Sequence, residues 1–175
     1  TTYTVIGTSV GGCTNNANIT LSITPFPTVT IVASNTSICS GVNVTLTATG
    51  ATNYTWNPGV LTGSIIVVSP SSTTIYNVTG VTGICANIAI VNIVVNPTPT
   101  ITTASSPTNI CAGSSATLSA SGATNYTWNP GALVGGTVTV NPSVTTLYTL
   151  SASNAFSCSA SGTVNVVVTP VPTVN

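Results

Sequence analysis

Cysteine and a twice-repeated aromatic stretch are the only parts of this sequence from which chemistry could be built. The five cysteines stand at positions 13, 39, 85, 111 and 158. No two of them have the Cys-x-x-Cys spacing that zinc and redox sites use. Their chemistry therefore reduces to two alternatives, disulfide bonds or free buried thiols.

The composition excludes most other functions, because the 175 residues include no Lys, Arg, Asp, Glu or His. Without His or carboxylates the chain has no general acid or base near neutral pH, so we expect no enzyme and no bound cofactor. Without carboxylates we expect no calcium site. Without Lys or Arg there is no electrostatic attraction to nucleic acid or to an anionic membrane surface. No apolar run approaches the roughly 20 residues of a membrane span, so we expect no membrane insertion.

The chain is organised as a repeat. The ten residues Gly-Ala-Thr-Asn-Tyr-Thr-Trp-Asn-Pro-Gly occupy 50–59 and again 122–131. Trp56 and Trp128 lie 72 residues apart, as do Cys39 and Cys111. A shared period of this kind indicates tandem repeats. We predict a partial repeat at 1–27, a complete repeat at 28–99, and a complete repeat with the start of a further linker at 100–175.

Proline pairs mark the predicted boundaries. Pro-x-Pro occurs at 25–27, 97–99 and 170–172. Such a linker is stiff and extended, so it should hold neighbouring domains end to end. For the partial repeat two explanations stay open. The sequence is a window from a longer array, which we favour because it also stops at a junction, or a neighbouring chain supplies the missing strands.

Hydrophobic residues alternate with polar ones throughout, which predicts strands and no helices. Val44, Leu46 and Ala48 share one face of a strand within 42–48. Further strands are predicted at 28–33, 64–69, 74–79 and 87–96. The same alternation places one set of aromatic side chains in the core: Tyr54, Trp56, Tyr76, Tyr126, Trp128 and Tyr148. It also places Ile19, Leu21 and Ile23 of the partial repeat inward.

The positions of the cysteines suggest one disulfide in each complete repeat. Cys39 and Cys85 flank the aromatic stretch of the first, and Cys111 and Cys158 flank that of the second. We therefore predict Cys39–Cys85 and Cys111–Cys158, with Cys13 bonded to a cysteine outside the sequence. Such loops would add about 4 kcal/mol to the free energy of unfolding on the chain-entropy model. Disulfides would also indicate a secreted, extracellular protein.

Four landmarks together resemble a known family. They are Cys39-Ser40-Gly41, Tyr54-Thr55-Trp56, Thr73-Thr74-Ile75-Tyr76 and Cys85, with Pro-x-Pro junctions between repeats. This set is similar to the Ig-like (PKD-like) repeats of very large secreted adhesins and surface fibres of Bacteroidota. The resemblance implies tandem Ig-like β-sandwich repeats, export to the bacterial cell surface and a longer parent protein. Members of that family usually carry charged residues, and this sequence has none.

Two functions are compatible with these observations. The first is a self-associating segment of a surface filament or adhesin stalk, whose partners are other copies or adjacent repeats. Ile65, Val67 and Ile90 stand at outward positions where the following repeat has Thr, so we expect an inter-subunit contact there. The second is a glycan- or ice-binding module that uses threonine rows such as Thr45/Thr47 and Thr137/Thr139. Threonine is also simply common on exposed strand faces.

Overall fold

The computed structural model describes residues 1–172, so residues 173–175 of the predicted last domain lie outside it. Over the described residues the chain forms eighteen strands and no helix, which confirms the all-β prediction. The chain divides into two compact units. The first comprises residues 1–33, 45–66 and 75–91, and the second comprises 34–44, 67–74 and the chain from Asn92 onward. No described helix is long and apolar enough to span a membrane.

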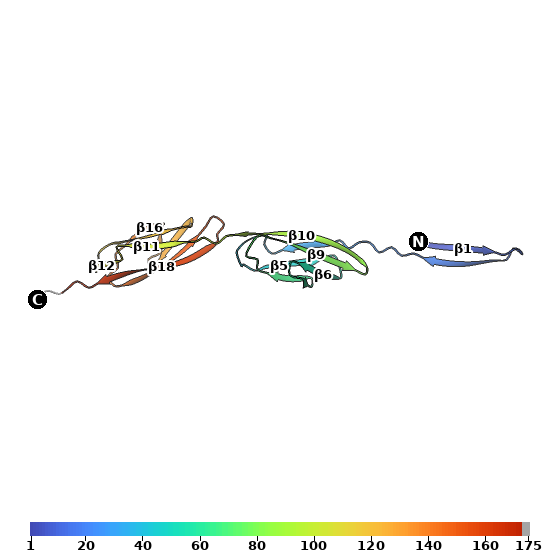
Figure 1. Cartoon of the computed structure of the whole chain (residues 1–175), viewed down its shortest axis with the longest axis horizontal. Coiled ribbons are helices and arrows are strands. Elements are labelled where there is room, and N and C mark those ends of the chain that lie inside the picture. The colour runs from blue at the N-terminus through green and yellow to red at the C-terminus, as the bar shows by residue number, and fades with distance from the viewer. Residues whose placement is uncertain (173–175) are drawn as a thin grey trace. The chain divides into compact units, whose positions relative to one another are not determined.

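The chain begins with a hairpin that forms a two-stranded sheet of its own (Figure 1). Strands β1 (Thr2–Thr8) and β2 (Thr14–Thr20) pair antiparallel, with Thr2 opposite Thr20 and Thr8 opposite Thr14. A two-stranded hairpin has no second sheet to cover either of its faces. Ile19, Leu21 and Ile23, which alternation placed inward, are therefore all exposed in the structure.

Two sheets follow the hairpin. One has the order β3-β5-β8 and the other β4-β10-β9-β6-β7. Their bounds are β3 (Thr30–Ala33), β4 (Ser37–Cys39), β5 (Val44–Thr49), β6 (Asn53–Asn57), β7 (Leu61–Thr62), β8 (Ile65–Val68), β9 (Thr74–Thr82) and β10 (Cys85–Asn96). The short strand β4 runs parallel to β10, with Cys39 opposite Asn96.

The next eight strands have the same order. They form the sheets β11-β13-β16 and β12-β18-β17-β14-β15. Their bounds are β11 (Thr102–Ser106), β12 (Asn109–Cys111), β13 (Ala116–Ser121), β14 (Asn125–Asn129), β15 (Leu133–Val134), β16 (Thr137–Val140), β17 (Thr146–Ser153) and β18 (Ser159–Thr169). Strand β12 runs parallel to β18 as β4 does to β10. In the first set, β5 and β8 thus share one sheet, and β6, β9 and β10 share the other. In the second set, β13 and β16 share one sheet, and β14, β17 and β18 share the other. This is the strand order of an immunoglobulin-like β-sandwich.

Alternation predicts the core correctly in both sets of strands. Val44, Leu46 and Ala48 are buried on β5, and Ala116 and Leu118 are buried on β13. In the second unit the buried residues form one cluster: Ile110, Ala116, Leu118, Trp128, Val140, Tyr148, Leu150, Ala152 and Val166. Burying one large apolar side chain stabilises a fold by roughly 1.5–3 kcal/mol.

The glycine that opens each copy of the repeated stretch has a steric role. Gly50 has φ of +95° and Gly122 has φ of +98°, a left-handed region that favours glycine. A Cβ atom at Gly50 would lie 1.8 Å from the carbonyl oxygen of Thr28, and at Gly122 it would lie 2.0 Å from that of Thr100. No side chain fits at either position.

The predicted disulfides are wrong. Among the described residues the structure forms one disulfide, between Cys39 and Cys158 in the second unit, with a Cα–Cα distance of 5.5 Å. Cys13, Cys85 and Cys111 are free. The pairs Cys39–Cys85 and Cys111–Cys158 do not form.

Strand geometry explains why. Cys111 lies opposite Thr169 at the end of β18, whereas Cys158 immediately precedes the start of that strand. Eleven residues of extended strand separate two points by roughly 35 Å. A disulfide needs Cα atoms within about 7 Å of one another. The same argument applies to Cys39, which lies opposite the last residue of β10, and to Cys85, which is its first residue.

Candidate functional site

The repeated aromatic stretch forms a core strand whose two buried aromatic side chains hydrogen-bond to backbone groups. Trp56 is fully buried and its Nε1 donates to the carbonyl of Gly63 at 2.8 Å. The hydroxyl of Tyr54 donates to the carbonyl of Ala51 and accepts from its amide, both at 2.7 Å. These contacts occupy the polar groups of both buried aromatic side chains. The stretch is a structural element.

The second copy makes the same contacts. Trp128 is fully buried and donates from Nε1 to the carbonyl of Gly135 at 3.1 Å. The hydroxyl of Tyr126 donates to Ala123 O at 2.7 Å and accepts from Ala123 N at 2.8 Å. Of the six residues predicted in the core, Tyr76 and Tyr148 are also buried, while Tyr126 is only half-buried.

Two buried tyrosines have raised pKa values, which link the stability of the fold to alkaline pH. Burial raises the pKa of Tyr76 and of Tyr148 above the ordinary value of 10.0. The unfolded chain therefore loses these protons first, near pH 10, while the folded chain still holds them. The stability that the neutral hydroxyls contribute is complete below that pH. It is lost as the pH rises through the raised pKa values that the two tyrosines have in the folded chain.

We accordingly expect a melting temperature that is constant from about pH 4 to pH 8, where the sequence has no carboxylate or histidine to titrate. Above about pH 10 it should fall. Calorimetry at fixed ionic strength measures both. Replacing Tyr76 and Tyr148 by Phe should reduce the alkaline fall, and Tyr3→Phe should leave it unchanged. A melting temperature that moved by several degrees between pH 4 and 8 would contradict this account.

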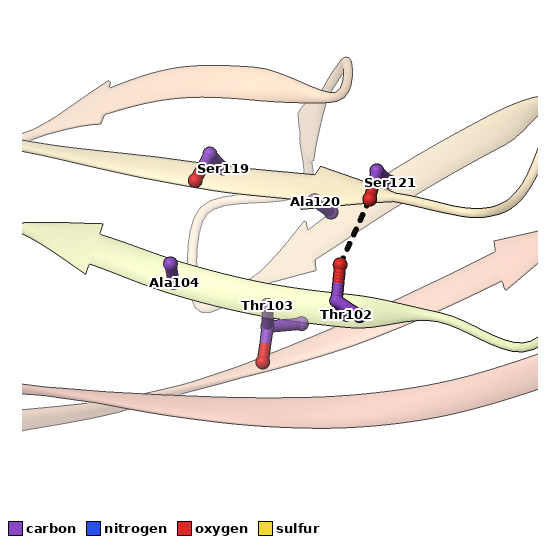
Figure 2. A pocket seen from close by; sticks show the side chains of 6 residues that line it. All are labelled: Thr102, Thr103, Ala104, Ser119, Ala120 and Ser121. Atoms are coloured by element: carbon purple, nitrogen blue, oxygen red, sulfur yellow. Dashed lines mark hydrogen bonds between the residues drawn. The ribbon is translucent and has the colours of Figure 1, made fainter.

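The outer face of the sheet β11-β13-β16 is covered with hydroxyl groups. Thr102 lies opposite Ser121, and Ser119 lies opposite Thr137. Figure 2 shows the hydroxyls of Thr102 and Ser121 pointing toward one another, and their oxygens are 2.8 Å apart. The shallow depression here has a volume of about 160 Å³ and is lined by Thr102, Thr103, Ala104, Ser119, Ala120 and Ser121. Ligand pockets are typically 300–1,000 Å³, so this depression is smaller than a usual ligand pocket.

Two other depressions lie in the first unit. One, of about 300 Å³, is lined by residues 52–55 and 62–64, and the other, of about 290 Å³, by Ile6 and residues 14–16. Both are open to solvent, and both offer hydroxyl, amide and backbone groups without charge. Over residues 1–172 no three side chains that could hold a metal ion gather in one place.

The apolar residues expected at an inter-subunit contact are exposed but do not form one patch. Ile65 (61% exposed) and Val67 (59%) lie on β8, at the edge of the three-stranded sheet. Ile90 (69%) lies on β10, in the other sheet. Ile75 and Ile88 are also exposed, on β9 and on β10 itself. Sequence reasoning missed these two residues, although both are large apolar residues at outward positions of predicted strands.

No protein-family model matches the sequence, and no curated protein matches it. Several solved structures are similar at low identity. A mouse coronavirus receptor-binding domain complexed with its murine receptor gives 12% identity over 81% of this chain and 100% of that chain, with a TM-score of 0.41. Murine CEACAM1b gives 12% identity over 82% and 100%, with a TM-score of 0.39. Three N-terminal domains of the highly immunogenic outer capsid protein of bacteriophage RB49 give 18% identity over 81% and 59%, with a TM-score of 0.35. The fold assignment rests on the strand order described above.

Proposed function

We propose that the protein is a structural, non-enzymatic segment of an extracellular filament or adhesin stalk, built from tandem immunoglobulin-like modules that associate with other copies of themselves. The modules are the predicted domains 28–99 and 100–175, joined by Pro-x-Pro linkers. The observation that carries the proposal is the burial of the repeated aromatic strand. Trp56 and Trp128 are fully buried and hydrogen-bonded within their modules, so their role is to stabilise the fold.

The uncharged surface supports self-association. With no Lys, Arg, Asp, Glu or His, the chain has no like-charge repulsion to keep copies apart. A net charge near zero promotes association. The Cys39–Cys158 disulfide supports an oxidising, extracellular location, where such bonds persist. The bacterial cell surface is the location that the family resemblance implies.

Lysine substitutions on the exposed apolar residues test the association. Val67→Lys and Ile90→Lys should each be tolerated in the folded chain, because both side chains are exposed. If one of these residues lies in the contact, its substitution by lysine should weaken association at least about tenfold, because burying an unpaired ammonium costs several kcal/mol. Because the two residues lie on different sheets, the single variants also identify the sheet that makes the contact. Sedimentation equilibrium measures the association constant.

Thr139→Lys and Thr163→Lys are the matched controls. These threonines stand one module further along, at the positions of Val67 and Ile90. They add the same charge to exposed strand positions that carry no apolar side chain. Equal weakening by all four variants would show that net charge alone, not the apolar residues, controls association. No weakening by any of them would place the contact elsewhere.

A second candidate function is recognition of glycans or ice by the hydroxyl face of β11-β13-β16. Threonine and serine side chains in register across three strands favour it. Ice-recrystallisation and polysaccharide pull-down assays distinguish it from the structural role. Activity at low protein concentration that is lost in Thr137→Val/Thr139→Val would support binding.

A further inference from the structure

The backbone around Cys39 is reproduced around Cys111. Each cysteine ends a three-residue strand that runs parallel to the last long strand of its sheet. The amide of the next residue donates to that long strand's last residue in both places, Ser40 N to Asn96 O at 3.2 Å and Ala112 N to Thr169 O at 3.1 Å. We call Cys39 and Cys111 the strand-end cysteines.

Cys158 also has counterparts. It follows a tight turn in which Asn154 N donates to Cys158 O at 3.0 Å, and Asn154 Oδ1 accepts from Cys158 N at 3.1 Å. At Cys13 the turn is the same: Ser9 N donates to Cys13 O at 2.8 Å, and Ser9 Oγ accepts from Cys13 N at 3.2 Å. We call Cys13, Cys85 and Cys158 the loop cysteines, because each lies at the hairpin turn before a long strand.

The sulfur atoms of Cys85 and Cys158 have similar surroundings. The thiol of Cys85 lies 3.5 Å from the carbonyl oxygen of Thr24. The sulfur of Cys158 lies 3.8 Å from the carbonyl oxygen of Asn96. Thr24 and Asn96 are 72 residues apart and each immediately precedes a Pro-x-Pro linker. Both loop cysteines therefore lie against the linker that leads into their own module.

The Cys39–Cys158 disulfide joins the two classes across a linker: the loop cysteine of one module bonds to the strand-end cysteine of the module before it. Pairing within a module is excluded by the length of the strand that separates its two cysteines. Cys111 and Cys13 are exposed and Cys85 is half-buried, so reagents and partners can reach the thiols.

We propose that this pairing is the rule of the array: Cys111 is a disulfide site for the loop cysteine of a following module, and Cys85 and Cys13 are sites for strand-end cysteines of preceding modules. The inference rests on the tandem-module proposal above. Each bond requires an oxidant, which we take to be a small-molecule or protein disulfide. The two thiols each lose a proton and together give two electrons, and the oxidant's disulfide is reduced to two thiols. A covalent ladder of bonds between neighbouring modules results.

Adding one module tests the rule. The full chain is extended after Asn175 by a second copy of residues 103–172, which continues the module in register because 173–175 stand where 100–102 stand in the preceding module. The extension adds copies of Cys111 and Cys158. After refolding in oxidised and reduced glutathione, the protein is alkylated with iodoacetamide under denaturing conditions, and its free thiols are counted by intact mass.

The unextended chain should show three free thiols. If the rule holds, the extended chain also shows three, because Cys111 bonds the added loop cysteine. Pepsin peptides should contain Cys111 joined to that loop, which Ser159→Ala in the added copy marks by mass. Cys111→Ser in the extended chain should raise the count to four.

Five free thiols in an extended chain whose added module is folded, by tryptophan fluorescence and circular dichroism, would overturn the inference and leave the structural function standing. An added module that does not fold would contradict the tandem-module proposal and this inference with it.

Discussion

Cys39→Ser is expected to lower the free energy of unfolding by about 5 kcal/mol. The Cys39–Cys158 bond closes a loop with a sequence separation of 119, the longest-range covalent constraint in the described chain. On the chain-entropy model the stabilisation grows with the logarithm of loop length, and about 5 kcal/mol is its value for a loop of this size. Urea titration followed by far-UV circular dichroism measures the loss, summed over every transition that the curve resolves.

Cys111→Ser is a closely matched control for that variant. Cys111 occupies the same position at the end of a parallel three-residue strand, with the same hydrogen bond from the following amide, but its thiol is free. An exposed substitution of this kind changes stability by no more than about 0.5 kcal/mol. A similar loss in both variants would show that the serine itself, and not the missing bond, is responsible.

Trp128→Ala is expected to cost about 3–5 kcal/mol, the usual range for deleting a large aromatic side chain from a core. Trp128 is fully buried in the cluster of the second unit, among Leu118, Leu150 and Val166. Its removal leaves a cavity and also takes away the donor that bonds the carbonyl of Gly135. A half-buried carbonyl left without its donor adds a cost of its own. The free energy of unfolding from urea titration is again the measurement.

Two further variants isolate the causes of that loss. Phe156→Ala removes an aromatic ring that is 61% exposed, so it should change stability by less than about 0.5 kcal/mol. Trp128→Phe keeps much of the buried area but no donor, so its cost should fall between the other two. If Trp128→Ala cost no more than Phe156→Ala, the repeated aromatic strand would not be the structural centre of the module.

The core was predictable from the sequence because alternation follows directly from strand geometry. The inward positions of Leu46 and Trp56 follow from alternation with the adjacent residues in the sequence alone. The strands β4 and β12 were not predictable in this way. Each has three residues, too few to show a period, and each pairs with a strand more than 50 residues away.

The cysteine pairing could not be read from spacing for a related reason. The sequence period shows which cysteines are equivalent, but it does not show at which end of a strand each one lies. Cys39 and Cys85 flank the aromatic stretch of one module in sequence, yet they lie at opposite ends of β10. Connectivity depends on that three-dimensional arrangement and cannot be deduced from spacing alone. The exposure of Ile65, Val67 and Ile90 was predictable, but their separation onto two sheets was not, because the sequence does not say which sheet a strand joins.

The lengths of the outermost strands bear on how the sandwiches avoid aggregation. A sheet edge presents unpaired amide and carbonyl groups, and proteins commonly protect it with lysine or another charge. This chain has no charged side chain with which to protect an edge. Its four sandwich sheets instead end in strands of two to five residues, β7 and β15 being two residues long, whereas the inner strand β10 has twelve. Protection by charge weakens in salt and changes with pH, whereas protection by short edges does neither.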